Sequence, residues 1–202
     1  MKVGVLCEES GVVRDAFAAR GHDAWSCDIL PRPGKHICGD CLAQDWSGFD
    51  LLICFPPCTY LCSSGLHRNK GNPKRQAKSA EAEAFVLRLW ELPVNKIGIE
   101  NPIGRLTRVL GAPSQIIQPF MFGHDASKAT CLWLRGLPKL IGTEEVAPRY
   151  VNGLPRWANQ TNSGQNREPP GPMRARRRSK TYPGIAAAMA EQWGSLPVRS
   201  TP

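Results

Sequence analysis

The chain has 202 residues, of which 42% are hydrophobic, so it can form one domain with a sizeable core but not two large domains. Its net charge of +9 favours a polyanionic partner such as nucleic acid, because neutralised phosphates release counterions; a soluble basic protein is the alternative. No apolar stretch is long enough to span a membrane, and Glu8 and Glu9 come too early for a signal peptide, which predicts a cytoplasmic protein.

The first part of the chain predicts a strand, a helix and a second strand. Residues 3–7 predict an apolar strand, and Ser10 in the following turn is a candidate helix cap. Apolar residues recur at helical spacing over 12–19, and Gly21 ends the pattern. Residues 23–28 predict the second strand, which ends in an acid. Such a unit builds a parallel sheet with a right-handed crossover.

Short apolar runs further along the chain predict the rest of the sheet. The expected strands are residues 36–40, 51–54, 97–99, 115–117 and 129–134. The run at 51–54 is apolar throughout, as a buried parallel strand is, and the last two strands are expected to be antiparallel near the sheet edge. The chain therefore predicts an α/β fold with a mostly parallel central sheet and helices on both faces.

The segments between these strands predict helices and loops. Residues 66–78 are polar and basic and contain the breaker Asn72-Pro73, which predicts a mobile loop. Strong helix formers predict a helix over 80–92. The remaining expected elements are an extended or looped region at 136–172, a basic run at 173–180 and a closing helix at 185–193. All 202 residues are expected to form a single domain.

The eight cysteines predict reduced thiols in a cytoplasmic protein. The spacings Cys38-x-x-Cys41 and Cys54-x-x-x-Cys58-x-x-x-Cys62 are compatible with a zinc site. Cys54, however, lies within an apolar run, and no His pair has the spacing of a zinc finger. We therefore predict no bound metal.

Two motifs at strand ends carry the predicted chemistry. Phe55-Pro56-Pro57-Cys58 follows the strand at 51–54, so a rigid turn presents one thiol where catalytic groups of open α/β sheets lie. Glu100-Asn101-Pro102 follows the strand at 97–99. A thiol nucleophile and a carboxylate on neighbouring strand ends are suited to covalent chemistry on a ring. A buried cysteine in a turn and an ordinary strand-ending turn are the structural alternatives.

These motifs resemble the catalytic motifs of the C5-cytosine DNA methyltransferases, and the compact phage and prophage members most closely. The resemblance covers most of residues 3–134 and 179–193. It implies a Rossmann-like class I methyltransferase fold, S-adenosylmethionine as the methyl donor, and duplex DNA as the partner, with the target cytosine flipped out. It also implies that Cys58 adds to C6 of the ring while a protonated Glu100 holds N3.

The same resemblance implies where the donor binds. The family has a Gly-rich turn after its first strand, and here only Gly11 matches those glycines well. Asp28 is expected at the ribose hydroxyls and Asp40 at the adenine amino group, with turn and capping roles as the alternatives. The turn at 179–184 resembles the last motif, which completes the donor pocket. The residues expected to bind the donor are Glu8, Ser10, Gly11, Asp28, Asp40, Pro56, Ser179 and Thr181.

Departures from the family concern recognition of the target. Where the family has Gln-x-Arg-x-Arg, this chain has Ser127-Lys128-Ala129-Thr130, so Lys128 is the candidate contact to phosphate or base. Residues 136–178 replace a large recognition domain and form a reduced loop region, rich in amides, hydroxyls and arginines, with a solvated loop as the alternative. The residues expected to bind substrate are Asn101, Lys128, Gln165, Arg167, Arg176 and Arg178. So small a recognition region indicates that the target sequence is short, or that there is almost no target sequence.

Two other functions stay open at this stage. The first is related C5 chemistry on a free cytosine nucleotide or RNA, or with a modified donor, and the missing recognition domain favours it. The second is a non-enzymatic basic DNA-binding or zinc-clip protein, which predicts bound zinc and indifference to S-adenosylmethionine. The presence of both Cys58 and Glu100 speaks against the second.

Overall fold

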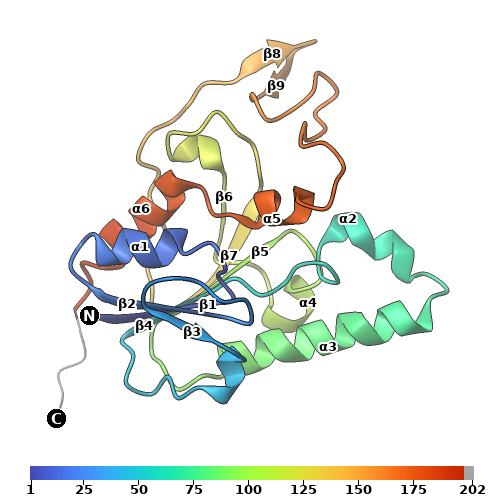
Figure 1. Cartoon of the computed structure of the whole chain (residues 1–202). Coiled ribbons are helices and arrows are strands. Elements are labelled where there is room, and N and C mark those ends of the chain that lie inside the picture. The colour runs from blue at the N-terminus through green and yellow to red at the C-terminus, as the bar shows by residue number, and fades with distance from the viewer. Residues whose placement is uncertain (198–202) are drawn as a thin grey trace.

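Within residues 1–197, which the computed structural model describes, a seven-stranded sheet forms the centre of the protein (Figure 1). The strands are β1 (Lys2–Leu6), β2 (Asp23–Asp28), β3 (His36–Cys38), β4 (Leu51–Cys54), β5 (Ile97–Pro102), β6 (Gln115–Ile117) and β7 (Thr130–Arg135). Their order is β3-β2-β1-β4-β5-β7-β6, with β3 to β5 mutually parallel and β7 antiparallel to β5 and β6. The predicted α/β fold with a mostly parallel sheet is confirmed.

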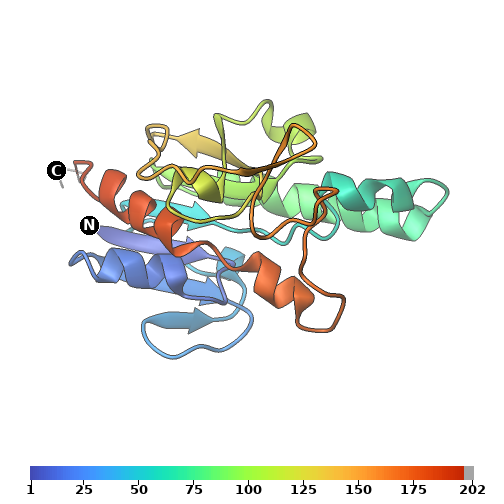
Figure 2. The same cartoon turned by 90° about the horizontal axis from the view of Figure 1, so that it is seen from above.

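Helices cover both faces of this sheet. They are α1 (Val12–Ala18), α2 (Ser63–Leu66), α3 (Pro73–Trp90), α4 (Thr107–Leu110), α5 (Arg174–Ser179) and α6 (Pro183–Gln192), with the 3-10 turns η1 (Cys41–Ala43), η2 (His67–Asn69) and η3 (Pro119–Met121). α1 and α6 lie side by side on one face (Figure 2), where Phe17 and Trp193 are fully buried. α3 lies on the other face, over a second core that contains Trp46 and Leu89. No helix in the described part of the chain is long and apolar enough to cross a membrane.

The chain changes direction across the sheet between β1 and β4. From β1 it builds outward to β3 and then returns to pair β4 with the other side of β1, with Leu6 opposite Cys54. In an open sheet of this doubly wound kind, such a switch point leaves a crevice at the carboxyl ends of the strands. The turns that follow β1 and β4, which carry Gly11 and Cys58, therefore leave the sheet side by side.

The segment at 66–78 is not the mobile loop that the sequence predicts. It contains the last residue of α2, all of η2 and the first turns of α3, which begins at Pro73. The side chain of Asn72 accepts a hydrogen bond from the Arg75 backbone N–H at 3.0 Å, so Asn72 caps the helix. Pro73 occupies the first turn, where its missing N–H costs nothing. The pair that resembles a breaker therefore starts the helix.

The region at 136–172 is mostly irregular, as predicted, but it contains a small hairpin. Strands β8 (Arg149–Val151) and β9 (Leu154–Arg156) pair antiparallel. Asn152 and Gly153 join them with φ values of 50° and 74°, the left-handed conformation that a two-residue hairpin turn requires. The Asn-Gly pair was the sequence signal for this hairpin. In Figure 1 the hairpin lies at the end of the molecule away from β1 to β4.

Candidate active site

Two neighbouring strands carry the thiol and the carboxyl of the predicted pair. Cys54 at the end of β4 lies opposite Ile99 in β5, so the turn to Cys58 begins beside Glu100. Glu100 lies within β5 rather than after it, because pairing with β7 extends the strand to Pro102. The structure therefore brings the two predicted catalytic residues to one edge of the sheet.

Asn101 fastens the turn of Cys58 to the strand of Glu100. Its side chain is 1% exposed, and its Nδ2 donates a hydrogen bond to the Pro56 carbonyl at 2.9 Å. The other end of the amide, Oδ1, is buried and has no hydrogen-bond partner within the described residues. Asn101 thus braces the site, whereas the sequence suggested a contact with substrate.

Replacing Asn101 with alanine is expected to lower the free energy of unfolding by about 1–3 kcal/mol, because the buried Pro56 carbonyl loses its donor. Chemical denaturation of the two proteins measures the difference. Asn162 is a matched control, since its side chain is exposed and accepts a bond from Arg149; its alanine variant should stay within about 0.5 kcal/mol. Equal losses in both variants would contradict the bracing role.

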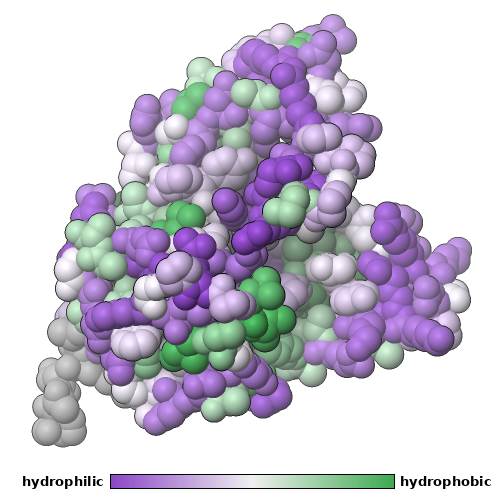
Figure 3. All heavy atoms as spheres, in the orientation of Figure 1, coloured by the Kyte–Doolittle hydropathy of each residue, from purple (hydrophilic) through white to green (hydrophobic). Residues whose placement is uncertain are grey.

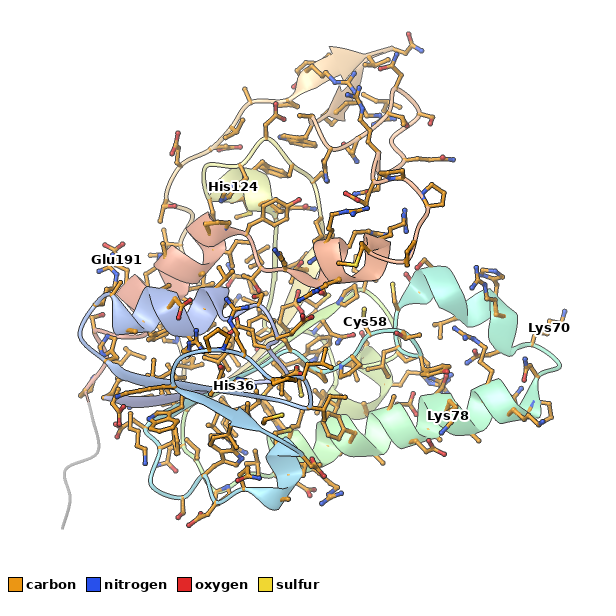
Figure 4. The ribbon with its side chains drawn as sticks, viewed as in Figure 1. His36, Cys58, Lys70, Lys78, His124 and Glu191 are labelled. Atoms are coloured by element: carbon orange, nitrogen blue, oxygen red, sulfur yellow. The ribbon has the colours of Figure 1, made fainter. Side chains whose placement is uncertain are left out.

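Cys58 presents an accessible thiol in a rigid turn. The Cys58 carbonyl accepts the backbone N–H groups of Leu61 and Cys62 at 3.0 and 2.9 Å, which holds the turn closed. The side chain is exposed, and Figure 4 shows it between α2 and α5. Partial desolvation raises the pKa of Cys58, as do Cys62 and Glu100, whereas the positive charge of Lys128 lowers it. Lys128 therefore favours the reactive thiolate.

Glu100 lies in a narrow pocket between the sheet and α6. Phe55, Thr130 and Tyr182 contribute to its walls. Burial raises the pKa of Glu100, opposed by the charge of Lys128 and by a hydrogen bond from Thr130. A carboxyl that keeps its proton to a higher pH can donate a hydrogen bond, as the predicted role requires.

Lys128 links this pocket to the basic helix α5. Its backbone N–H donates to Gln118 Oε1 at 2.8 Å, and its Nζ donates to the Arg178 carbonyl at 3.0 Å. The same ammonium acts on the pKa values of both Cys58 and Glu100. The structure thus joins Lys128 to the predicted catalytic pair.

The turn after β1 is organised by Glu8. This carboxylate is 4% exposed and accepts hydrogen bonds from the Val13 N–H and the Ser10 hydroxyl, each at 2.9 Å. It therefore satisfies a free N–H at the start of α1. Gly11 takes the cap position with φ 66°, and Ser10, the predicted cap, lies one residue before it, where its hydroxyl accepts the Val12 N–H at 3.3 Å. Ser10 and Glu8 therefore share the capping of α1. Burial raises the pKa of Glu8 despite these bonds.

Two acids predicted to bind the donor follow β2 and β3. Asp28 ends β2, and its Oδ1 accepts the Leu30 N–H at 3.0 Å. Ile29 beside it is 75% exposed. Asp40 caps η1 through the Leu42 N–H at 2.9 Å, which is the alternative role that the sequence left open.

Arg32 is a further residue beside the turn after β1 that sequence reasoning missed. Its Nη1 donates to the Glu9 carbonyl at 2.9 Å, and a Cβ placed on Gly11 would overlap its guanidinium. Its Nε is buried and has no partner among the described residues. An orphaned cationic N–H beside Gly11 is suited to an anionic group of a ligand. The signal in the sequence was an arginine between two prolines, shortly after Asp28.

The segment at 174–181 lies against the pocket and the first turn. Arg176 forms an ion pair with Glu9, so this arginine is not unopposed. The Ser179 hydroxyl donates to the Arg176 carbonyl at 2.9 Å, within its own helix. Thr181 lines the same pocket as Glu100. The structure therefore brings Thr181 to the pocket and keeps Ser179 within α5.

Of the remaining predicted substrate contacts, Gln165 and Arg167 lie apart from this pocket. Gln165 and Arg167 have exposed side chains, and their backbones bond to Thr161 and Asn159. Neither residue lines the pocket of Glu100. Arg178 is exposed on α5. Among residues 1–197, no three His, Cys, Asp or Glu side chains are grouped so as to hold a metal ion.

Comparisons with known proteins add no family to these observations. A scan against models of protein families finds no match, and a search of curated protein sequences finds no significant similarity. The geometry of the site is therefore the basis for any functional proposal.

Proposed function

We propose that the protein transfers a methyl group from S-adenosylmethionine to C5 of cytosine in DNA. One observation carries the proposal: an exposed thiol, Cys58, and a carboxyl with a raised pKa, Glu100, lie on neighbouring strand ends that the Asn101–Pro56 hydrogen bond holds together. The doubly wound sheet, with its switch point between β1 and β4, is the kind of fold that the class I methyltransferase resemblance implies.

The chemistry needs a group that makes carbon 5 of cytosine nucleophilic. The Cys58 thiolate, favoured by Lys128, forms a bond to C6. The electron pair of the C5–C6 double bond then shifts through C5 and C4 toward N3. Glu100 donates a hydrogen bond to N3 as negative charge develops there. Carbon 5 then bonds to the methyl carbon as the bond from that carbon to the donor sulfur breaks. A base or water removes the C5 proton, the double bond reforms and the Cys58 thiolate leaves.

Residues at and after the ends of β1 and β2 fit S-adenosylmethionine, which supplies an electrophilic methyl group when bound. Asp28 has one carboxylate oxygen without a hydrogen bond in the described part of the chain, and carboxylates at this position suit ribose hydroxyls. The exposed Ile29 offers an apolar surface to a purine. The orphaned Nε of Arg32 suits the donor's carboxylate.

Replacing Asp28 with alanine is expected to weaken binding of S-adenosylmethionine at least about tenfold, because two hydroxyl bonds to a charged acceptor are lost. Isothermal titration calorimetry measures the dissociation constant. Asp45 is a matched control: it accepts the N–H of Ser47 two residues on, as Asp28 accepts that of Leu30, but it lies before β4. An Asp45→Ala variant as weak as Asp28→Ala would contradict the role of Asp28.

The proposal is tested by incubating the protein with isotopically labelled S-adenosylmethionine and cytosine-containing duplex DNA, then digesting the DNA and searching for labelled 5-methylcytosine by mass spectrometry. Labelled product supports the proposal. A folded protein that binds the donor but yields no product overturns it. In that case, turnover of dCMP or dCTP would establish the nucleotide alternative, and stoichiometric zinc with no donor binding would establish the non-enzymatic one.

A further inference from the structure

A basic arm follows the nucleophile in the chain. We define the basic arm as residues 63–78, which comprise α2, η2 and the first turns of α3 (Figure 1). Its exposed cations are Arg68, Lys70, Lys74 and Lys78. Among residues 1–197, only Lys78 of these four has an acidic partner, Glu81 at 2.8 Å. Figure 3 shows this part of the surface as strongly hydrophilic. Three positive charges are thus left without a counter-charge.

The basic arm is fastened to the turn that carries Cys58. Arg75 Nη2 donates to the Thr59 carbonyl at 3.2 Å, and its guanidinium lies 4.9 Å from the centre of the Tyr60 ring. The Ser79 hydroxyl donates to the Tyr60 carbonyl at 2.9 Å, and the buried Asn69 donates to Ser79 at 2.9 Å. These bonds fix the arm relative to the nucleophile, so its charges lie at a defined place beside Cys58.

A second group of cations lies on the other side of Cys58. Arg178 is exposed on α5 with its carbonyl hydrogen-bonded to Lys128 at 3.0 Å, and Arg176 is exposed there but paired with Glu9. In Figure 4 the labelled Cys58 lies between α2 and α5, and Lys70 and Lys78 lie along the arm beyond it. The accessible thiol is therefore flanked by two basic elements from distant parts of the chain.

We propose that the basic arm binds the phosphates of duplex DNA beside the flipped cytosine, and that α5 binds the backbone on the opposite side. This inference rests on the proposed function and names the surface that holds its substrate. Exposed lysines and arginines attract phosphate without reading sequence. Lys74 and Lys78 lie one helical turn apart, about 6 Å along α3, so they face the same side. Affinity from such contacts compensates for the small size of the region at 136–178.

The test compares two variants of the full chain that lose the same charge. The arm variant carries Arg68→Gln, Lys70→Gln and Lys74→Gln, all exposed positions without ion pairs in the described structure. The control variant carries Lys35→Gln, Arg88→Gln and Lys139→Gln, exposed positions toward the amino ends of the parallel strands, before β3, at the end of α3 and after β7. Of these, Lys35 is paired with Asp23. Circular dichroism confirms that each variant is folded.

Fluorescence anisotropy then measures the affinity for a short labelled duplex between about 50 and 200 mM salt. Each lost phosphate contact reduces the slope of log affinity against log salt by about 0.9, so the arm variant should lose about 2–3 in slope and at least about tenfold in affinity. The control variant should keep the wild-type slope.

Two outcomes overturn the inference, and they differ in what else they affect. If the arm and control variants have the same slope while the wild type binds and methylates duplex DNA, the arm is not the phosphate-binding surface and the proposed function stands. If the wild type shows no salt-dependent binding to duplex DNA, the inference and the DNA partner of the proposed function both fail.

Discussion

The alanine variant of Cys58 is expected to lose methyl transfer, with a turnover rate more than about 10³-fold below that of the wild type. In the proposed mechanism, the Cys58 sulfur is the atom that bonds to C6. The side chain is exposed, so its removal leaves the core unchanged and the variant should unfold at the same denaturant concentration. Single-turnover assays with labelled donor measure the rate.

Trapping of the covalent bond tests the same residue without turnover. In DNA with 5-fluorocytosine, incubated with S-adenosylmethionine, C5 carries fluorine and the transferred methyl group but no proton, so the step that releases Cys58 cannot occur and the Sγ–C6 bond persists. Mass spectrometry should show this adduct with the wild type and none with Cys58→Ala. Cys62→Ala is the matched control, because Cys62 is the neighbouring thiol, bonded to the Ser64 hydroxyl at 3.2 Å. Adduct formation by Cys58→Ala but not by Cys62→Ala would show that Cys62, and not Cys58, is the nucleophile.

Glutamine in place of Glu100 is expected to slow methyl transfer by about 10²–10⁴-fold, the usual contribution of a positioned acid. The amide keeps the size of the side chain but has no carboxyl proton to hold at N3. The pH dependence separates this role from a structural one. Wild-type activity should fall as pH rises through the raised pKa of Glu100, because the carboxyl loses its proton. The variant should lack that fall and keep only the rise with ionisation of Cys58. A variant with the wild-type profile would exclude Glu100 as the acid.

The stability of the Glu100→Gln variant provides the control for folding. Burial raises the folded-state pKa of Glu100 above its ordinary value of 4.5, so the unfolded chain loses this proton first. Wild-type stability contributed by the protonated carboxyl is therefore complete below 4.5 and is lost as pH rises through the folded pKa. The variant has no such loss and should be the more stable protein near neutral pH. Low activity in a more stable protein cannot result from unfolding.

Local patterns were sufficient for most of the sheet. The strand at 23–28 matches β2 and the strand at 51–54 matches β4, because short apolar runs between polar turns have few other ways to bury their side chains. The local patterns led to a wrong prediction where one dipeptide can occur in two structural contexts. Asn72-Pro73 breaks a helix when it lies inside one and starts a helix when it precedes one. The choice depends on the packing of α3, which no local window contains.

The sequence by itself determined the order of the strands along the chain, the motifs at two strand ends and the excess of positive charge. Tertiary structure alone decided how these parts meet. Three contacts join residues far apart in the chain. They are the hydrogen bond from Asn101 to Pro56, the charge of Lys128 beside Cys58 and Glu100, and the unpartnered Nε of Arg32 beside Gly11. Local propensity acts over a few residues, whereas burial, hydrogen bonding and pKa depend on which distant atoms lie within a few ångströms.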